Sequence, residues 1–265
     1  MADRGSAILF DLDETLMVEY DSVDQAFRAT CERAKVRCGL DAEKLYTSIR
    51  ERAREIWYSS PLKGFCQTLG FSSAEGLWGS FNGPVDPLPR FYEWIPAYRR
   101  QAWTAALADL GIDDPQLVRF LIDTFPRERS RRHVVFPDSV PTLNRLAQRH
   151  RLALITNGIP ELQNEKLDRG RLTPYFDPIL ISGGLGIAKP DPRIFQIALE
   201  KLRVQPDRAV MVGDNLNRDV QGARRAGLKA VWINRSGADL PPDIQPDATI
   251  QTLDDLPALT RKWLE

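Results

Sequence analysis

The chain has 265 residues, enough for one large domain or for a domain with a sizeable insertion. Its 36 Lys and Arg balance its 36 Asp and Glu, which disfavours nucleic-acid and membrane-surface partners. No run approaches the roughly 18 consecutive apolar residues of a membrane span, and the first residues lack the apolar stretch of a secretory signal, so we expect a cytoplasmic protein. The three cysteines, Cys31, Cys38 and Cys66, form no Cys-x-x-Cys pair and indicate free thiols.

Near the N-terminus, two carboxylates follow an apolar run. Residues 7–10 predict a short buried strand, and Asp11 and Asp13 come directly after it. Alternate side chains of an extended segment share a face, so the carboxylates can point together, at a cost of roughly 4 kcal/mol at about 4 Å with an effective dielectric of about 20. A cation, a shared proton or separation must offset that repulsion. Alternatively, both aspartates only cap the turn after the strand.

A helical block follows this first strand. Apolar stripes at helical spacing run through residues 23–34, 45–56, 103–110 and 117–125. Residues 70–94 lie between them, are rich in Gly, Pro and aromatic residues, and show no period. Two interpretations remain open for this stretch: a lid that faces the substrate, or aromatic packing at the end of the bundle. The candidate substrate-facing side chains are those of Trp78, Phe81, Trp94 and Arg99.

A basic run lies near the end of the helical block, at Arg127, Arg129, Arg131, Arg132 and His133. Its position suggests a connection between two parts of the chain, so we interpret it as a solvated linker rather than a nucleic-acid site. The alternative is that one of these arginines contacts an anionic substrate.

From about residue 136 the pattern alternates between strands and helices. The predicted strands are 152–156, 179–182, 209–212 and 230–233, and the predicted helices are 139–149, 161–168, 193–202 and 219–226. This alternation predicts an α/β, Rossmann-like parallel sheet with helices on both faces. The first strand needs the same sheet. We therefore expect an α/β core of residues 1–17 and 136–265 and an inserted all-helical cap of residues 18–135.

Polar groups fall just after the predicted strands, where open parallel sheets bind ligands. Thr156 offers a hydroxyl, and Asn157 with the following glycine offers backbone amides before a helix, which suits an anion. Lys189 adds a positive charge on a loop stiffened by proline. Asp214 adds a carboxylate that, with Asp11, can hold Mg²⁺ through oxygen ligands.

In this order, the motifs resemble the haloacid dehalogenase superfamily, in its helical-cap phosphatase branch. Two segments, Val210–Gly222 and Gly227–Asn234, are similar to N-acylneuraminate-9-phosphatases, and the Thr156–Gly158 turn to pyrimidine nucleotidases. The resemblance implies Asp11 as the nucleophile and Asp13 as general acid and base. It further implies phosphate contacts from Thr156, Asn157 and Lys189, Mg²⁺ ligands from Asp11, Asp214 and the backbone carbonyl of Asp13, and Asp219 behind these ligands.

We therefore expect a Mg²⁺-dependent phosphatase that hydrolyses a small phosphate monoester, a sugar phosphate or a nucleotide, through an aspartyl-phosphate. Alternatives are a phosphomutase, a haloacid dehalogenase or a non-catalytic binding module. True dehalogenases of this superfamily lack the second aspartate, so Asp13 favours phosphoryl chemistry. The expected partner is a small phosphorylated metabolite, with no nucleic acid or membrane, and the chain is expected to be a monomer or homodimer. Glu14 stands where relatives carry a small or amide residue, and its role is open.

Overall fold

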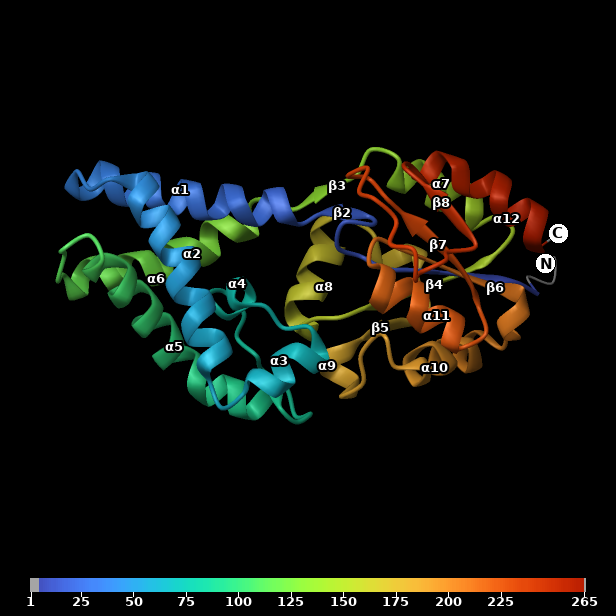
Figure 1. The fold of residues 1–265 in the computed structure, drawn as a ribbon, viewed down its shortest axis with the longest axis horizontal. Coiled ribbons are helices and arrows are strands. Elements are labelled where there is room, and N and C mark those ends of the chain that lie inside the picture. Colours follow the sequence, from blue (N-terminus) through green and yellow to red (C-terminus); the bar gives the residue numbers. More distant parts are fainter. Residues whose placement is uncertain (1–4, 265) are drawn as a thin grey trace. The chain divides into compact units, whose positions relative to one another are not determined.

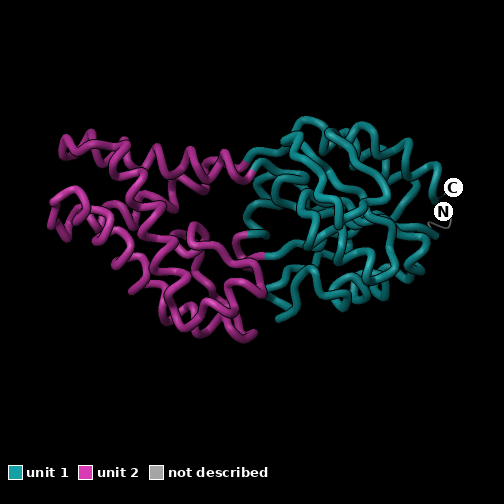
Figure 2. Tube along the Cα trace, in the orientation of Figure 1, with its two compact units in different colours: residues 1–18, 134–157, 163–265 teal, residues 19–133, 158–162 magenta. Residues whose placement is uncertain are grey.

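The computed structural model describes residues 5–264, which fold into two compact units (Figure 1, Figure 2). The core unit contains residues 5–18, 134–157 and 163–264 of the described chain, and the helical unit contains Glu19–His133 and Gly158–Leu162. The ranges differ from the predicted core and cap chiefly at residues 158–162. This short segment belongs to the helical unit because Ile159 and Leu162 pack against Gly79, and Glu161 accepts hydrogen bonds from the backbone of residues 80–82.

The core unit is built on a six-stranded sheet in which all neighbouring strands are parallel. In sheet order the strands are β5 (Ile179–Ile181), β4 (Arg151–Thr156), β1 (Ala7–Phe10), β6 (Ala209–Gly213), β7 (Lys229–Ile233) and β8 (Ala248–Ile250). A separate antiparallel pair joins β2 (Met17–Val18) to β3 (Val134–Val135). The carboxyl ends of β4, β1 and β6 are adjacent, which gathers the segments after them at one edge of the sheet.

Helices cover both faces of the sheet. They are α7 (Ser139–Leu146), α8 (Pro160–Arg169), α9 (Ser182–Leu185), α10 (Pro192–Leu202), α11 (Gly222–Arg225) and α12 (Leu256–Leu264). Short helical turns connect them: η1 (Thr173–Tyr175), η2 (Pro206–Arg208), η4 (Leu253–Asp255) and the π-helical η3 (Leu216–Gln221). The predicted α/β Rossmann-like fold is confirmed. The single helix predicted over residues 219–226 is instead η3 followed by α11.

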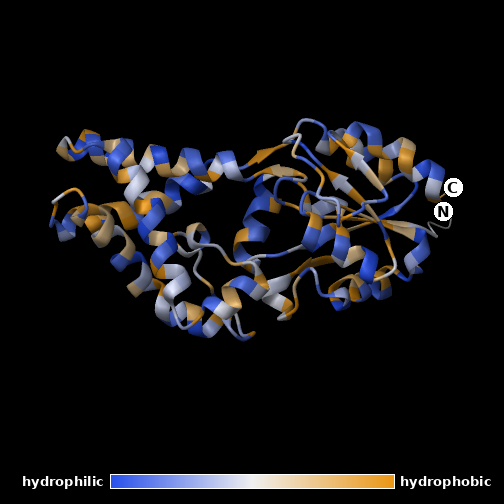
Figure 3. Ribbon diagram, viewed as in Figure 1, coloured by the Kyte–Doolittle hydropathy of each residue, from blue (hydrophilic) through white to orange (hydrophobic). Residues whose placement is uncertain are grey.

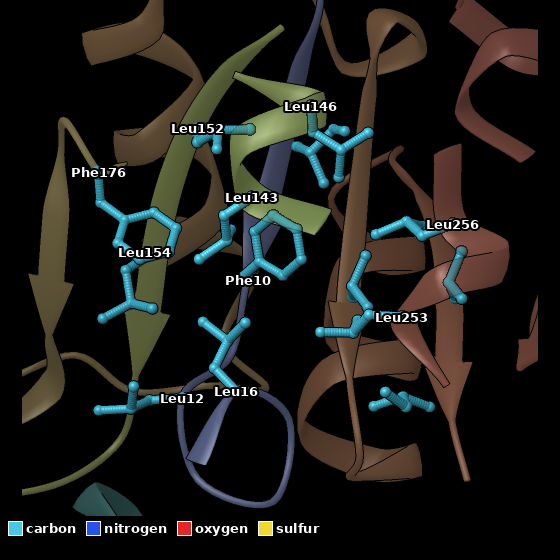
Figure 4. Close-up of a cluster of buried hydrophobic side chains, with 14 of the residues drawn as sticks. Phe10, Leu12, Leu16, Leu143, Leu146, Leu152, Leu154, Phe176, Leu253 and Leu256 are labelled. Atoms are coloured by element: carbon cyan, nitrogen blue, oxygen red, sulfur yellow. The ribbon is translucent and has the colours of Figure 1, made fainter. Parts of the chain in front are cut away.

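The alternation of side chains along β1 explains why the sheet has two apolar faces. Ile8 and Phe10 pack into a cluster with side chains of α7 and α12, and Figure 4 shows Phe10 and Leu143 among these side chains. Ala7 and Leu9 point to the other face, into a cluster with side chains of α10 and α11. All four are fully buried, which accounts for the continuous apolar run that precedes Asp11. Figure 3 shows the same hydrophobic character along the strands of the sheet.

The helical unit contains α1 (Tyr20–Cys38), α2 (Ala42–Ser59), α3 (Lys63–Leu69), α4 (Ser73–Gly76), α5 (Leu88–Ala108) and α6 (Pro115–Ser130). In it, α2 packs against α5 and α1 against α6. Caps define several helix starts: the Asp41 carboxylate accepts from the second and third amides of α2, and Ser72 and Glu75 form a capping box on α4. The three cysteines are free, as predicted, and Cys31 is buried among the helices.

The aromatic stretch at residues 70–94 packs inside the helical unit. Phe81 is fully buried and its ring lies 5.0 Å from that of Phe91 and 6.0 Å from that of Trp57. The guanidinium of Arg99 donates to the carbonyl oxygens of Gly76 and Gly79, at 3.0 and 2.5 Å. Of the two interpretations left open by the sequence, packing therefore holds for Phe81. The guanidinium of Arg99 is likewise committed to the backbone of this unit.

The solvated-linker interpretation of the basic run is wrong for Arg129. This residue lies in the last turn of α6 and is fully buried. Its guanidinium pairs with Glu19 and lies 5.0 Å from the ring of Trp78. Arg132 pairs with the buried Glu128 at 2.6 Å. Charge alone misled the prediction, because the half-buried Glu19 and the buried Glu128 compensate these arginines.

Within residues 5–264, no helix combines the length and the apolar character needed to span a membrane.

Candidate active site

Asp11 begins the segment that follows β1, and Lys189 neutralises it. The Lys189 Nζ lies 2.6 Å from Asp11 Oδ1 and 2.7 Å from Asp219 Oδ1, and the lysine is 2% exposed. Burial raises the pKa of Asp11 to about 7, with Lys189 opposing and the Asp219 charge adding to the rise. Burial also works to lower the pKa of Lys189, but the carboxylates of Asp11 and Asp219 more than offset it and raise that pKa. The lysine therefore stays charged between two carboxylates.

A third carboxylate completes this cluster. Asp214 follows β6, and one oxygen from each of Asp11, Asp214 and Asp219 lies within 4.8 Å of the others. Burial raises the pKa of Asp214 to about 9, and repulsion from Asp11 and Asp219 adds to the rise. Three hard oxygen donors that repel one another in this way fit a Mg²⁺ ion, whose charge would relieve the repulsion.

The side chains of Asp219 and Trp232 hold the backbone just after β6 in place. A Cβ atom on Gly213 would lie 2.3 Å from Asp219 Cγ, so the close approach of Asp219 requires glycine there. Asp219 Oδ2 accepts the backbone N–H of Asn215 at 2.9 Å. The indole N–H of Trp232 donates to the backbone carbonyl of Asp214 at 2.8 Å. The backbone around Asp214 is thus hydrogen-bonded to its neighbours.

The turn after β1 brings Asp13 back toward the site. The N–H groups of Leu16 and Met17 both donate to the carbonyl of Leu12, at 2.9 and 3.0 Å. Glu14 adopts a left-handed conformation with φ of 58°, and its N–H donates to the carbonyl of Met17 at 2.7 Å. The charge of Glu14 also contributes to the raised pKa of Asp214, after the larger effects of burial and of the other aspartates. Glu14 therefore adds negative charge beside the site.

The carboxylate of Asp13 faces α8 rather than Lys189. Lys166 Nζ lies 2.9 and 3.0 Å from the two oxygens of Asp13. Gln163 Nε2 donates to Asp13 Oδ2 at 3.1 Å and to the Thr156 hydroxyl at 2.6 Å. Asp11 and Asp13 thus have different cations, which separates the two like charges that the sequence places one residue apart.

Asn157 links the segment after β4 to the loop that carries Lys189. Its side-chain amide donates to the Lys189 carbonyl at 2.9 Å and accepts from the Lys189 N–H at 3.0 Å. The side chain therefore holds the backbone of Lys189 through two hydrogen bonds.

The seven predicted site residues all lie in the core unit, and the structure joins them into two groups. Lys189 gathers Asp11 and Asp219, with Asp214 beside them, while Asp13 is connected through Gln163 to Thr156. The sequence-based prediction missed Gln163, Lys166 and Trp232. The sequence did hold a signal for Gln163 and Lys166. At 3.6 residues per turn they share the apolar face of α8 with Leu162 and Leu167. A polar side chain on a buried face needs a hydrogen-bonding or charged partner there.

The chain is similar to known hydrolases in both sequence and fold. The model of haloacid dehalogenase-like hydrolases matches residues 6–227. A phosphoserine phosphatase of Thermus thermophilus is 36% identical over 247 residues, which are 93% of this chain and 95% of that protein. The human N-acylneuraminate-9-phosphatase is 39% identical over 260 residues, 97% of this chain and 94% of its own length. A 2-haloacid dehalogenase structure from Pseudomonas syringae has a TM-score of 0.63 and 28% identity, covering 97% of this chain and 99% of that one.

The family model spans most of the chain, and both relatives align over more than nine-tenths of it. The predicted similarity to N-acylneuraminate-9-phosphatases and the predicted class of enzyme are confirmed. This chain belongs to the haloacid dehalogenase-like hydrolases, and within them to the phosphoric monoester hydrolases.

Proposed function

We propose that the chain hydrolyses a small phosphate monoester in a Mg²⁺-dependent reaction through an aspartyl-phosphate on Asp11. The observation that carries the proposal is the division of the site carboxylates: Asp11 lies against Lys189, and Asp13 is held apart by α8. Two carboxylates in different surroundings suit two different tasks.

The charges of the site support the metal. Four site carboxylates are present, those of Asp11, Asp13, Asp214 and Asp219, and two site lysines, Lys166 and Lys189. If all are ionised, these four carboxylates exceed the two lysines in charge, and Glu14 adds a further negative charge beside them, an excess that a divalent cation would reduce. We propose that the carboxylates of Asp11 and Asp214 and the backbone carbonyl of Asp13 hold Mg²⁺, with Asp219 beside them. When bound, Mg²⁺ neutralises charge on the phosphoryl oxygens.

The first step forms the phosphoenzyme. An Asp11 oxygen attacks phosphorus, the bond from phosphorus to the ester oxygen breaks, and that oxygen takes a proton from Asp13. Lys189, the Thr156 hydroxyl and the backbone N–H of Asn157 bind the oxygens of the phosphoryl group. Splitting the displacement in this way replaces one difficult step by two easier ones.

The second step releases the enzyme. Asp13, now ionised, takes a proton from a water molecule while the oxygen of that water attacks phosphorus. The bond between phosphorus and Asp11 breaks, which gives inorganic phosphate and restores both carboxyl groups. A single residue that first gives and then takes a proton is an efficient acid and base for such a pair of steps.

Phosphoserine and N-acylneuraminate 9-phosphate, the substrates named in two relatives, are both small phosphate monoesters that also carry a carboxylate. We propose a substrate of the same size class. A screen with these two esters, sugar phosphates and nucleotides in the presence of Mg²⁺ tests this proposal by measuring released phosphate. An isomerised ester in place of free phosphate would identify a phosphomutase instead.

The matched variants are Asp11→Asn and Asp254→Asn, the same change at an exposed position of η4. We expect Asp11→Asn to lower phosphate release by at least about a thousandfold, because no nucleophile remains, and Asp254→Asn to match the unmodified chain. Release that survives Asp11→Asn would refute the covalent mechanism.

A further inference from the structure

Two buried polar side chains of α8 converge on Asp13. Gln163 and Lys166 lie one helical turn apart, and their exposed fractions are 0% and 1%. Lysine is almost never fully buried unless it is paired. Here the Lys166 ammonium bridges both Asp13 oxygens, and the Gln163 amide reaches the second one.

These contacts restrain a side chain that would otherwise rotate. Asp13 lies outside the named strands, in an isolated β-bridge with Met17, and its side chain keeps 27% of its surface exposed. Contacts to both oxygens determine the plane of the carboxylate, while the exposed part leaves room for a reacting group. Because α8 is a regular helix, it offers a rigid support for both donors.

Gln163 also connects Asp13 to Thr156. Its amide nitrogen lies 2.6 Å from the Thr156 hydroxyl and 3.1 Å from Asp13 Oδ2. One buried side chain therefore sets the spacing between the proposed acid and base and a proposed phosphate contact. A change of about 1 Å in such spacing can alter a rate about a hundredfold.

Stability alone does not account for a lysine at this position. Replacing both members of a buried ion pair by apolar residues of similar volume is often neutral or stabilising, so the pair as a whole is not required for stability. Leu162 and Leu167 flank Lys166 on the buried face, so an apolar side chain there would continue the stripe. The charge has a use in orienting Asp13 that an apolar residue would lack.

We propose that Lys166 and Gln163 are positioning residues, which act through Asp13 and hold its carboxylate where it exchanges a proton with the ester oxygen and with water. The inference rests on the proposed function, in which Asp13 is the acid and base. It deepens that function by assigning two residues of α8 to the proton-transfer steps.

The test compares Lys166→Met and Gln163→Leu with Lys201→Met, a matched change at an exposed position of α10. With the best alkyl phosphate from the substrate screen, we expect kcat to fall about 10- to 100-fold for both site variants while KM changes less than about threefold. Lys201→Met should leave both constants unchanged. If Lys166→Met does not fold, as judged by circular dichroism, Lys166→Gln takes its place and should show a smaller fall in kcat.

Rapid-quench kinetics separates positioning from a general structural defect. Nitrophenolate leaves without a proton, so Lys166→Met should keep the burst of nitrophenol from p-nitrophenyl phosphate. With an alkyl phosphate, the burst of released alcohol should be lost, because the leaving ester oxygen needs the proton of Asp13. Loss of both bursts would overturn the inference.

A double-mutant cycle with Asp13→Asn provides the decisive comparison. If Lys166 acts through Asp13, Lys166→Met should cause no further fall in kcat when Asp13→Asn is already present. If Lys166→Met lowers kcat equally in the unmodified chain and in the Asp13→Asn variant, the inference is overturned and the role of Asp13 stays intact. The same holds if Lys166→Met alone leaves kcat unchanged. If Asp13→Asn itself keeps full activity, the proposed role of Asp13 fails, and the inference fails with it.

Discussion

Lys189 shows how a single charged residue organises the site. Its ammonium is almost completely shielded from solvent and touches two carboxylates from different segments, Asp11 after β1 and Asp219 in η3. Its backbone is held in turn by the Asn157 side chain after β4. One lysine thus connects three segments that lie far apart in the sequence.

Replacing Lys189 with Met leaves Asp11 and Asp219 buried without their cation. In the absence of divalent metal at pH 8, we expect the free energy of unfolding to fall by roughly 3–5 kcal/mol. At pH 5 the fall should be smaller, because protonation relieves the repulsion below the raised pKa of Asp11, about 7. Urea unfolding measures both values, with Lys201→Met as the control. An equal loss at the two pH values would contradict this electrostatic explanation.

At the scale of elements, the site depends on how closely η3 approaches the end of β6. The π-helical turn places Asp219 directly over Gly213, in the space that a Cβ atom would occupy. Irregular helical turns of this kind are frequent at functional sites. The path of the backbone, rather than the chemistry of any one side chain, determines where this carboxylate lies.

Gly213→Ala tests that close approach. The new methyl group would force Asp219 away, so we expect a loss of about 1–3 kcal/mol in stability and a clear fall in phosphate release. Gly64→Ala is the matched control, because its Cβ position has no contact within 4 Å beyond its chain neighbours and its own helix backbone. Gly64 also lies in α3, where alanine is favoured by up to about 1 kcal/mol. Thermal unfolding and the phosphate assay measure the two effects. A Gly213→Ala variant as stable and active as the unmodified chain would show that Asp219 has room to move.

At the scale of the whole molecule, the acidic cluster links folding stability to the binding of protons. Burial raises the pKa of Asp11 to about 7 and of Asp214 to about 9, both from the ordinary value of 3.8. The folded chain therefore binds more protons at these carboxyls than the unfolded chain between about pH 4 and pH 9. Their contribution to stability is present below about pH 4 and is lost as the pH rises through 7 and then 9.

If the proposed site holds Mg²⁺, the ion should counteract that loss, because it would bind the ionised carboxylates of the folded chain. We expect the difference in Tm between samples with Mg²⁺ and with chelator to grow from pH 5.5 to pH 9. At a hundredfold excess of Mg²⁺ over its Kd, binding should raise the free energy of unfolding by about 2.7 kcal/mol. Thermal unfolding across this range measures the difference. In the Asp214→Asn variant, the difference in Tm between Mg²⁺ and chelator should stay small at every pH. If this difference does not change with pH in the unmodified chain, the assignment of the site is contradicted.

Much of the fold was predictable because the pattern of apolar residues is local. The apolar run of β1 and the alternation after residue 136 predicted the parallel sheet and placed Asp11, Thr156 and Asp214 just after strands. The order that makes β4, β1 and β6 neighbours came from the structure. The basic run was misinterpreted at Arg129 for the opposite reason: a charged residue at a given position does not reveal whether Glu19 lies near enough to compensate it.

The sequence by itself determined the parallel sheet, the helical insertion and the candidate motifs, since hydrophobic period and residue type act over short stretches of chain. Only the tertiary structure decided which cation serves which carboxylate. Lys189 and Asp11 are 178 positions apart, and Lys166 and Asp13 are 153 apart. Pairings over such separations depend on the final path of the backbone, which brings α8 to Asp13 and the Lys189 loop to Asp11.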